Sequence, residues 1–389
     1  MHVTDAITHT IATPRVLAGA AVIVIAAGLL SAPFGGIAGA TVPPGLVNPP
    51  NRPMQTQHAF KCQKLTNKNV AKYLSTWSKI YTKCVAAIAA CVQTKGSDPA
   101  CLAKAADGCN KGIPKLADDF DKDAGTLLEN SVTDFCGSLS PSEAFTDPGG
   151  PLFGNLGTTC HDRFGFTPSF IQGYASCLFE ETNCVAESEF LFQMPRAHDL
   201  LVTAGINIGH ALTSTHSCLT NENGSGALPT TDAGKALLKC EKSADKAGVS
   251  FASKARGAFA KCADAVMNCA QLKPTQKCVD SAAKLCTKQL TTVDDAQTKL
   301  TDAVTKACSG IPFDDLSDVN GGGAGTLATA CSNLGVSPFT MVGDYATCLA
   351  REERCQVEDS IMFAVPRINE FLTDAGQSVS VPSAFCPAP

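Results

Sequence analysis

The chain has 389 residues, a hydrophobic content of 44% and a formal net charge of −5, and it contains 20 cysteines. Neither half of the sequence is basic and no run of lysine and arginine occurs, which argues against a nucleic-acid partner, because such a partner needs a basic face. This many cysteines, in an even number, are typical of disulfides formed in an oxidising compartment, so the sequence predicts a secreted or periplasmic protein.

The first 40 residues have the features of an export signal. Arg15 precedes an apolar run from Val16 to Leu30, and Ala38-Gly39-Ala40 matches a small-residue cleavage site. We expect cleavage after this site, which leaves no membrane span in the mature chain. The alternative is an uncleaved anchor, since the apolar stretch 16–40 is just long enough to cross a bilayer. Residues 41–60 contain five prolines and predict an extended linker.

The cysteines fall into two runs of ten with closely matching spacings. The steps are 22, 7, 10, 8, 27, 24, 17, 7 and 34 residues in the first run and 22, 7, 9, 8, 22, 23, 17, 7 and 31 in the second. Such agreement indicates an internal duplication. It predicts two tandem homologous, disulfide-linked domains, at 61–218 and 239–389, joined by a linker at 219–238.

Helical periodicity dominates both repeats. In the first, Val70, Tyr73 and Trp77 recur at steps of three and four residues, so one face of a long helix is apolar. The stretch Gly96–Pro99 ends that helix and begins a second one, and Lys273–Thr275 is the corresponding turn of the second repeat. The predicted fold is therefore all-α, and each domain has a long antiparallel helical hairpin plus a further helix that is kinked at a proline.

The cysteine spacing also predicts which cysteines pair across each hairpin. Residues equally far from the turn of an antiparallel hairpin face each other, and three cysteine pairs of the second repeat share a midpoint at or beside Pro274. The first repeat has a similar arrangement. The six predicted disulfides are Cys240–Cys308, Cys262–Cys286, Cys269–Cys278, Cys62–Cys136, Cys84–Cys109 and Cys91–Cys101.

The last four cysteines of each repeat leave their pairing open. Within each set, two cysteines lie seven residues apart on one predicted helix, too far apart to bond each other. They must pair with the remaining two, in either order. The residues concerned are Cys160, Cys177, Cys184 and Cys218, and in the second repeat Cys331, Cys348, Cys355 and Cys386.

One carboxylate shares a helix face with two of these cysteines. Glu181 follows Cys177 by four residues and precedes Cys184 by three. Glu352 has the same place between the corresponding cysteines of the second repeat. We expect this face to be inward and predict two buried ion pairs, Glu181 with Arg196 and Glu352 with Arg367. The alternative roles for such a carboxylate are general acid, metal ligand and ligand anchor.

Known catalytic and metal-binding patterns do not accompany this carboxylate. Zinc sites need cysteines or histidines two to four residues apart, whereas the smallest cysteine step here is seven. We therefore predict no enzymatic activity, no cofactor and no metal.

These observations favour an exported, non-enzymatic, disulfide-rich binding or structural module whose protein partner is unknown. A first alternative is a carrier of a small hydrophobic ligand, which would lie between alanine-rich helices. A second alternative is a hydrolase-like enzyme that uses Glu181 or Glu187. The side chains expected to line the cavity of a carrier are Trp77, Phe179, Phe190 and Phe192.

Overall fold

All regular secondary structure in the described part of the chain is helical, so the all-α prediction is confirmed. The computed structural model describes residues 53–117, 123–165, 167–206, 218–219 and 224–387. These residues belong to a unit that spans Ala40–Pro389, and the predicted signal peptide lies outside them.

The first repeat begins with the predicted hairpin. Helix α1 (Pro53–Lys95) starts inside the predicted linker, because proline at a first helical position has no N–H to leave unsatisfied. The second arm of this hairpin is divided into three shorter helices, α2, η1 and α3. Asp98 begins α2 by accepting a hydrogen bond from the Cys101 amide at 3.1 Å. The bounds are Pro99–Gly112 for α2, Ile113–Leu116 for η1 and Ala124–Cys136 for α3.

The second repeat forms its hairpin from two uninterrupted helices, α8 (Thr231–Gln271) and α9 (Gln276–Cys308). Each begins at a threonine whose side chain accepts a backbone hydrogen bond. Thr230 accepts from the Ala233 amide at 3.2 Å, and Thr275 accepts from the Cys278 amide at 3.3 Å. Helix α8 therefore begins within the segment predicted as a linker, 219–238.

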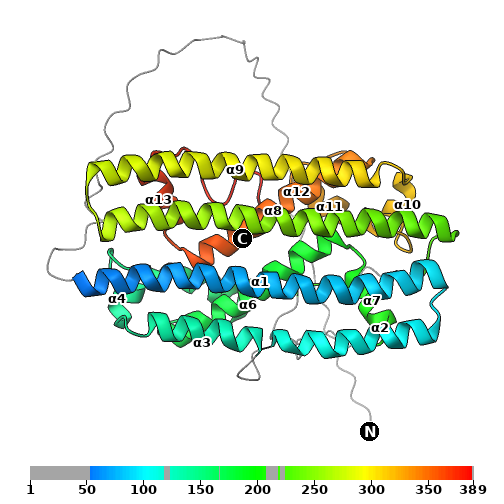
Figure 1. The fold of residues 1–389 in the computed structure, drawn as a ribbon, viewed down its shortest axis with the longest axis horizontal. Helices are drawn as coiled ribbons and strands as arrows, with labels where there is room; N and C mark the ends of the chain where they lie inside the picture. Colours follow the sequence, from blue (N-terminus) through cyan, green and yellow to red (C-terminus); the bar gives the residue numbers. More distant parts are fainter. Residues whose placement is uncertain (1–52, 118–122, 166, 207–217, 220–223, 388–389) are drawn as a thin grey trace, which may run out of the picture. The chain divides into compact units, whose positions relative to one another are not determined.

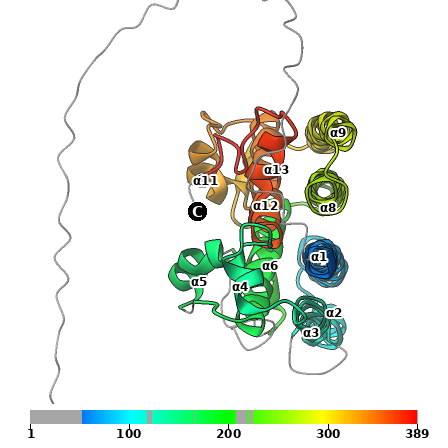
Figure 2. The ribbon, with the colours of Figure 1, turned by 90° about the vertical axis from the view of Figure 1, so that its left-hand side faces the viewer.

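The two hairpins form one layer, and the remaining helices form a second layer behind it (Figures 1 and 2). Across the first layer the order is α9, α8, α1 and then α2 with α3 (Figure 2). The second layer contains α4 (Pro141–Phe145), η2 (Phe153–Leu156), α5 (Gly157–Phe164), α6 (Ile171–Gln193) and α7 (Ala197–Thr203) from the first repeat. The second repeat contributes α10 (Phe313–Ser317), η4 (Ala324–Leu327), α11 (Ala328–Asn333), α12 (Val342–Ala364) and α13 (Ile368–Asp374).

The further helix of each repeat is broken rather than kinked. Helix α6 ends at Gln193 and α7 starts at Ala197, and the same gap separates α12 from α13. Pro195 and Pro366 lie in these gaps, and proline lacks the N–H that would continue the helical hydrogen bonds.

Ten disulfides connect the described parts of the chain. The hairpins contain the six bonds whose partners share a midpoint, with Cα–Cα distances of 4.7–5.7 Å. The structure also decides the pairing that the spacing left open, and it decides it identically in both repeats. These four bonds are Cys160–Cys177, Cys184–Cys218, Cys331–Cys348 and Cys355–Cys386.

The two repeats pack against each other through equivalent residues. Helix α1 lies antiparallel to α8, and α6 lies against α12. The Tyr174 hydroxyl donates to the Phe363 carbonyl at 3.0 Å, and the Tyr345 hydroxyl donates to the Phe192 carbonyl at 2.9 Å. Because each tyrosine reaches the same position of the other repeat, the contact is reciprocal, as in a symmetric dimer.

Candidate functional site

Glu181 is buried, as expected, but the predicted ion pair with Arg196 is wrong. Its partner is Arg163, whose Nη1 lies 2.8 Å from Glu181 Oε1 and 3.0 Å from an oxygen of Asp359. Helix α6 continues for 12 residues after Glu181, roughly 18 Å, before it ends at Gln193, and Arg196 lies beyond that end. Burial and the neighbouring Asp359 carboxylate raise the pKa of Glu181 well above its usual range.

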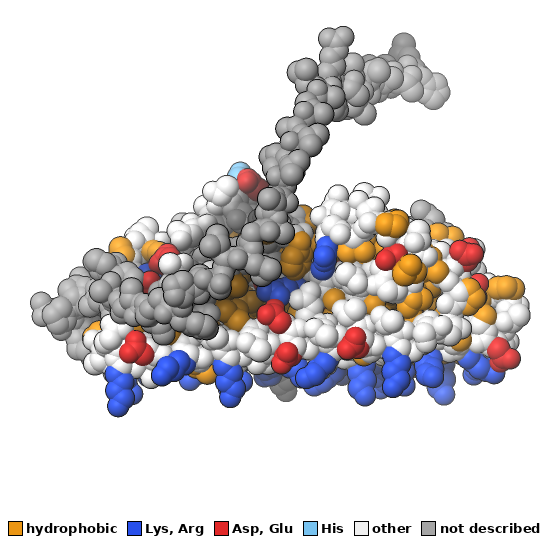
Figure 3. All heavy atoms as spheres, turned by 90° about the horizontal axis from the view of Figure 1, so that it is seen from above, with side chains coloured by type: hydrophobic (Ala, Val, Ile, Leu, Met, Phe, Trp, Pro, Cys, Tyr) orange, Lys and Arg blue, Asp and Glu red, His pale blue; other side chains and the backbone are white. Residues whose placement is uncertain are grey.

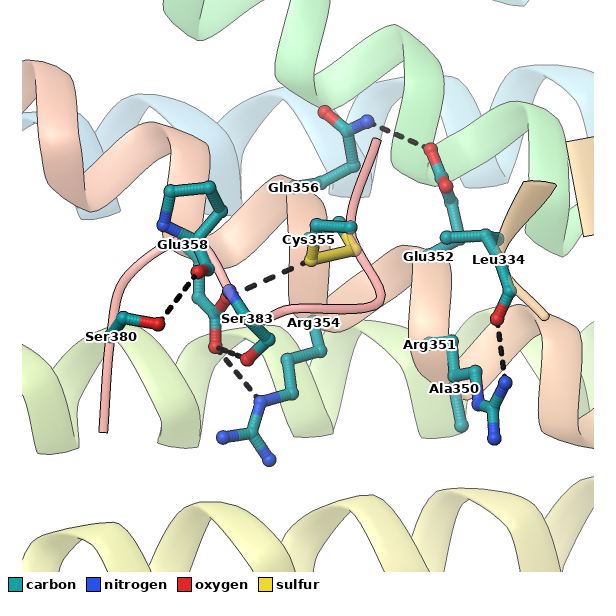
Figure 4. The surroundings of a disulfide bond; sticks show 12 residues. Leu334, Ala350, Arg351, Glu352, Arg354, Cys355, Gln356, Glu358, Ser380 and Ser383 are labelled. Atoms are coloured by element: carbon teal, nitrogen blue, oxygen red, sulfur yellow. Dashed lines mark hydrogen bonds and ion pairs between the residues drawn. A yellow bond between two sulfur atoms is a disulfide. The ribbon is translucent and has the colours of Figure 1, made fainter. Parts of the chain in front are cut away.

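The predicted pair of Glu352 with Arg367 is wrong for the same geometric reason. Glu352 Oε1 instead accepts a hydrogen bond at 2.8 Å from Gln356, one turn further along α12 (Figure 4). Burial raises the pKa of Glu352 to about 7. The carboxylate therefore has a local partner on its own helix.

Arg196 instead binds the backbone of the other repeat. Its guanidinium donates to the carbonyls of Asn320 at 2.6 Å and Gly321 at 3.1 Å. It also donates at 3.1 Å to each of two carbonyls in the segment that connects the repeats, those of Gly224 and Gly226. The side chain is only 2% exposed, so these four bonds replace its hydration.

Arg367 makes the equivalent contact in the opposite direction. Its guanidinium donates to the carbonyls of Pro148 and Gly150 in the first repeat, the latter at 3.0 Å, and it pairs with Glu370 at 2.8 Å. The two arginines, at equivalent positions of the two repeats, thus each bind a glycine-rich loop of the other repeat. We call these the arginine–loop contacts.

Further buried carboxylates lie between α6, α8 and α12. Glu189 forms an ion pair with Arg256, which also donates at 3.2 Å to the Ser360 hydroxyl. Glu353 accepts a hydrogen bond from Gln193 at 2.6 Å. Burial raises the pKa of Glu189 and Glu353 above the usual range of a carboxylate. Both side chains make their contacts with a residue of the other repeat.

Glu187, the other carboxylate considered for catalysis, fixes the end of its repeat. Its Oε2 accepts hydrogen bonds from the amides of Cys218 at 2.5 Å and Leu219 at 3.2 Å. The equivalent Glu358 accepts from the Ser383 hydroxyl at 2.7 Å and from Arg354 at 2.9 Å, beside the Cys355 disulfide (Figure 4). Both glutamates are buried and hold the segment that carries the last cysteine.

The aromatic residues expected around a ligand pack against one another and against other rings of the core. Trp77 stacks on Tyr81 with ring centroids 3.8 Å apart, and Phe190 meets Trp77 edge-on at 5.5 Å. The indole N–H of Trp77 donates to Asn183 Oδ1 at 3.2 Å, so its polar atom is satisfied. The two grooves described below lie elsewhere, on the hairpins.

The feature that the sequence reading missed is the distribution of lysine. The chain has 31 lysines and arginines, of which eight are arginines, so 23 are lysines. All of them fall between residues 61 and 122 or between 235 and 306, and helix α1 contains no aspartate or glutamate. Counting lysines along the chain, rather than over each half, would have found this signal.

The described lysines are all exposed, and they lie opposite the apolar faces of their helices. On α1 their steps are 3, 4, 4, 7 and 4 residues from Lys61 to Lys83, which keeps them on one side of the helix. Lys and Arg side chains gather along one edge in Figure 3, which is the outer side of the layer formed by α9, α8, α1 and α2. We call this surface the lysine face. The premise that the chain has no basic face is therefore wrong.

Two grooves open on the hairpins that carry the lysine face. The first groove, of about 680 Å³, lies between α1 and α2, and the second, of about 530 Å³, lies between α8 and α9. Five lysines line each of them. They are Lys79, Lys83, Lys104, Lys111 and Lys115 in the first groove. They are Lys239, Lys246, Lys254, Lys299 and Lys306 in the second.

The two grooves lie at the same level along the layer. Thr82 of α1 donates a hydrogen bond to Asp245 of α8 at 2.6 Å, and both residues lie within the stretches of α1 and α8 that border the grooves. The grooves are therefore neighbours, separated by the α1–α8 pair.

Comparison of the chain with protein-family models, with curated proteins and with solved structures found no match. Among the described residues, no cluster of three or more histidine, cysteine, aspartate or glutamate side chains has an arrangement suited to a metal ion. None of the helices in the described part of the chain is long and apolar enough to cross a membrane.

Proposed function

We propose that the protein is an exported, non-enzymatic binding module that holds an anionic partner against its lysine face. The observation that supports this proposal is the confinement of all lysines to the hairpin segments, with every described lysine exposed. Elsewhere in the described residues the charged side chains are largely acidic or are arginines that are buried or half-buried, so the lysine face is the basic surface of a chain whose net charge is −5.

The residue type favours a broad anionic surface over a single small anion. Lysine presents a compact, hydrated charge on a flexible stem, whereas arginine is preferred where planar, bidentate recognition of one carboxylate or phosphate matters. The described arginines are buried or half-buried, whereas every described lysine is exposed. The ten disulfides and the reciprocal contacts between repeats keep that face flat and rigid outside the cell.

The test is retention of the oxidised chain on immobilised heparin, used as a generic polyanion. We expect binding that weakens steeply with salt, because lysines release counterions from a polyanion. The face variant carries Lys61→Glu, Lys68→Glu and Lys72→Glu, three exposed positions of α1 outside both grooves. It should bind at least tenfold more weakly.

The control variant has the same change in net charge, −6, on the opposite layer. It replaces six exposed neutral side chains by glutamate: Asn155, Thr158, Gln172, Thr329, Ser332 and Asn333. If net charge alone governs retention, both variants will elute at the same salt concentration, and the proposal is then wrong. If the lysine face is the site, only the face variant will elute early.

A further inference from the structure

We infer that the two grooves bind an anionic lysophospholipid, one molecule in each groove, with its single acyl chain along the groove floor and its headgroup among the rim lysines. This inference rests on the proposed function, because it names the anionic partner of the lysine face.

The floors of the grooves are apolar. In the first groove Ile80, Ala87 and Ala105 lie between the lysines, together with cysteines of two disulfides. In the second groove Phe251 and Leu300 form the equivalent surface. A polysaccharide or nucleic acid would contact the lysines and leave these floors in water, whereas an amphiphile covers both kinds of surface.

The walls suit a charged headgroup at the mouth of each groove. A lysine side chain lies along an apolar surface with its methylene stem and keeps its ammonium group in water. Lysines from both helices line each groove, so ammonium groups flank the floor from two sides. Lys111 is partly neutralised by Asp107 at 2.6 Å, and both of these side chains are exposed.

The dimensions fit one acyl chain per groove. The first groove follows α1 from Lys79 to Cys91, which corresponds to roughly 18 Å of helix, and the second follows α8 from Lys239 to Lys254, roughly 22 Å. One leaflet of a bilayer core is about 15 Å thick, the depth occupied by a lipid acyl chain. The volumes of about 680 and 530 Å³ lie in the range of small-molecule sites.

The separation of the grooves predicts two independent lipids rather than one. The α1–α8 pair lies between them, and packed helices are about 8–10 Å apart, so the grooves are roughly 20 Å apart. We expect a stoichiometry of two per chain.

The experiment is calorimetric titration of the oxidised full chain with 18-carbon lysophosphatidylglycerol below its micelle concentration. Lysophosphatidylcholine of the same chain length tests the headgroup charge, and glycerol 3-phosphate tests the need for the chain. We expect two bound lysophosphatidylglycerol molecules, at least tenfold weaker binding of the choline lipid, and no measurable binding of glycerol 3-phosphate. Equal affinity for the two lipids would overturn the inference.

Variants then locate the sites. Ala87→Phe fills the first groove and Ala303→Phe fills the second, and both alanines are exposed, so the helices tolerate the larger side chain. Each variant should bind one lipid and the double variant none. The matched control is Ala71→Phe, at an exposed alanine of α1 outside the grooves, which should still bind two.

The outcomes separate this inference from the proposed function. Groove-filling variants should keep their retention on heparin, because the lysines of the face remain. Two bound lipids in the double variant would overturn the groove assignment, whatever the heparin result. If the face variant loses its retention on heparin and the wild-type chain binds no lipid, the proposal of an anionic partner stands and only the lipid inference is wrong.

Discussion

Replacing Arg196 by methionine removes one of the two arginine–loop contacts and keeps most of the side-chain volume. The guanidinium makes four hydrogen bonds to backbone carbonyls, and three of these carbonyls belong to glycines. Gly323 of the same loop has φ +71°, and a Cβ there would lie 2.7 Å from Arg196 Cγ, so the loop is shaped around this side chain.

The expected loss of stability follows from the carbonyls that would be left unsatisfied. Two of the four bonds, those to Gly321 and Gly224, are buried. A buried acceptor without a partner costs about 1–3 kcal/mol, and the more exposed carbonyls recover water at little cost. Burial lowers the pKa of Arg196, which shows that the guanidinium is partly desolvated, and removing it recovers that cost. We expect a net loss of about 3 kcal/mol.

Guanidinium denaturation of the oxidised protein measures this loss, with Arg351→Met as the matched control. Arg351 is half-exposed and makes one hydrogen bond, to the Leu334 carbonyl at 2.6 Å (Figure 4), so its loss should be about 1 kcal/mol. Hydrogen exchange should also accelerate at residues 318–323 of the second repeat in the Arg196 variant. Equal losses for the two arginines, with unchanged exchange at 318–323, would refute the reasoning.

Three further predictions concern the interior. Tyr174→Phe and Tyr345→Phe each remove one buried hydrogen bond between the repeats, and they should destabilise by a similar amount, about 1–2 kcal/mol in urea denaturation; a large inequality would contradict the reciprocal packing. Replacing both Cys62 and Cys136 by serine opens a 74-residue loop, and the chain-entropy model predicts that the free energy of unfolding falls by about 4.5 kcal/mol. An unchanged free energy of unfolding would mean that this disulfide does not form in solution. Burial raises the pKa of Glu241 from 4.5 to about 8, so the folded state binds this proton more tightly than the unfolded state does. Its contribution is complete below pH 4.5 and declines as the pH rises to about 8, by an upper bound of about 5 kcal/mol, and Glu241→Gln should flatten this part of a stability–pH curve. A curve of the same slope in the variant would assign the pH dependence to other groups.

The cysteine spacing predicted six disulfides because these pairs obey a local geometric rule. In a hairpin of two straight helices, equal distance from the turn is enough to bring two residues together, and Cys262 and Cys286 need no further information. Of the other four bonds, two join α6 or α12 to a short helix of the second layer, and two join α6 or α12 to an irregular segment. The path of such a segment depends on what it packs against, so the spacing alone left Cys184 open between two partners.

The two predicted ion pairs are wrong because the recurrence of a glutamate and an arginine in both repeats does not imply that the two side chains are close in space. Glu181 and Arg196 recur together with Glu352 and Arg367, and this recurrence reports a role common to both repeats. The role of the arginines is to bind a loop of the other repeat, which no pattern within one repeat reveals. Arg163, the actual partner of Glu181, has no matching arginine in the second repeat.

The sequence by itself determined the helical class and the hairpin disulfides, and it indicated an internal duplication. These features depend on local periodicity and on residue spacing along single helices, which the chain carries without reference to its fold. Only the tertiary structure decided that the repeats interlock, that α1 lies beside α8, and that the lysines of both hairpins therefore form one face with two neighbouring grooves. The physical reason is that the packing of one repeat against the other depends on the buried tyrosines, arginines and carboxylates meeting across that interface, and those contacts join residues more than a hundred positions apart.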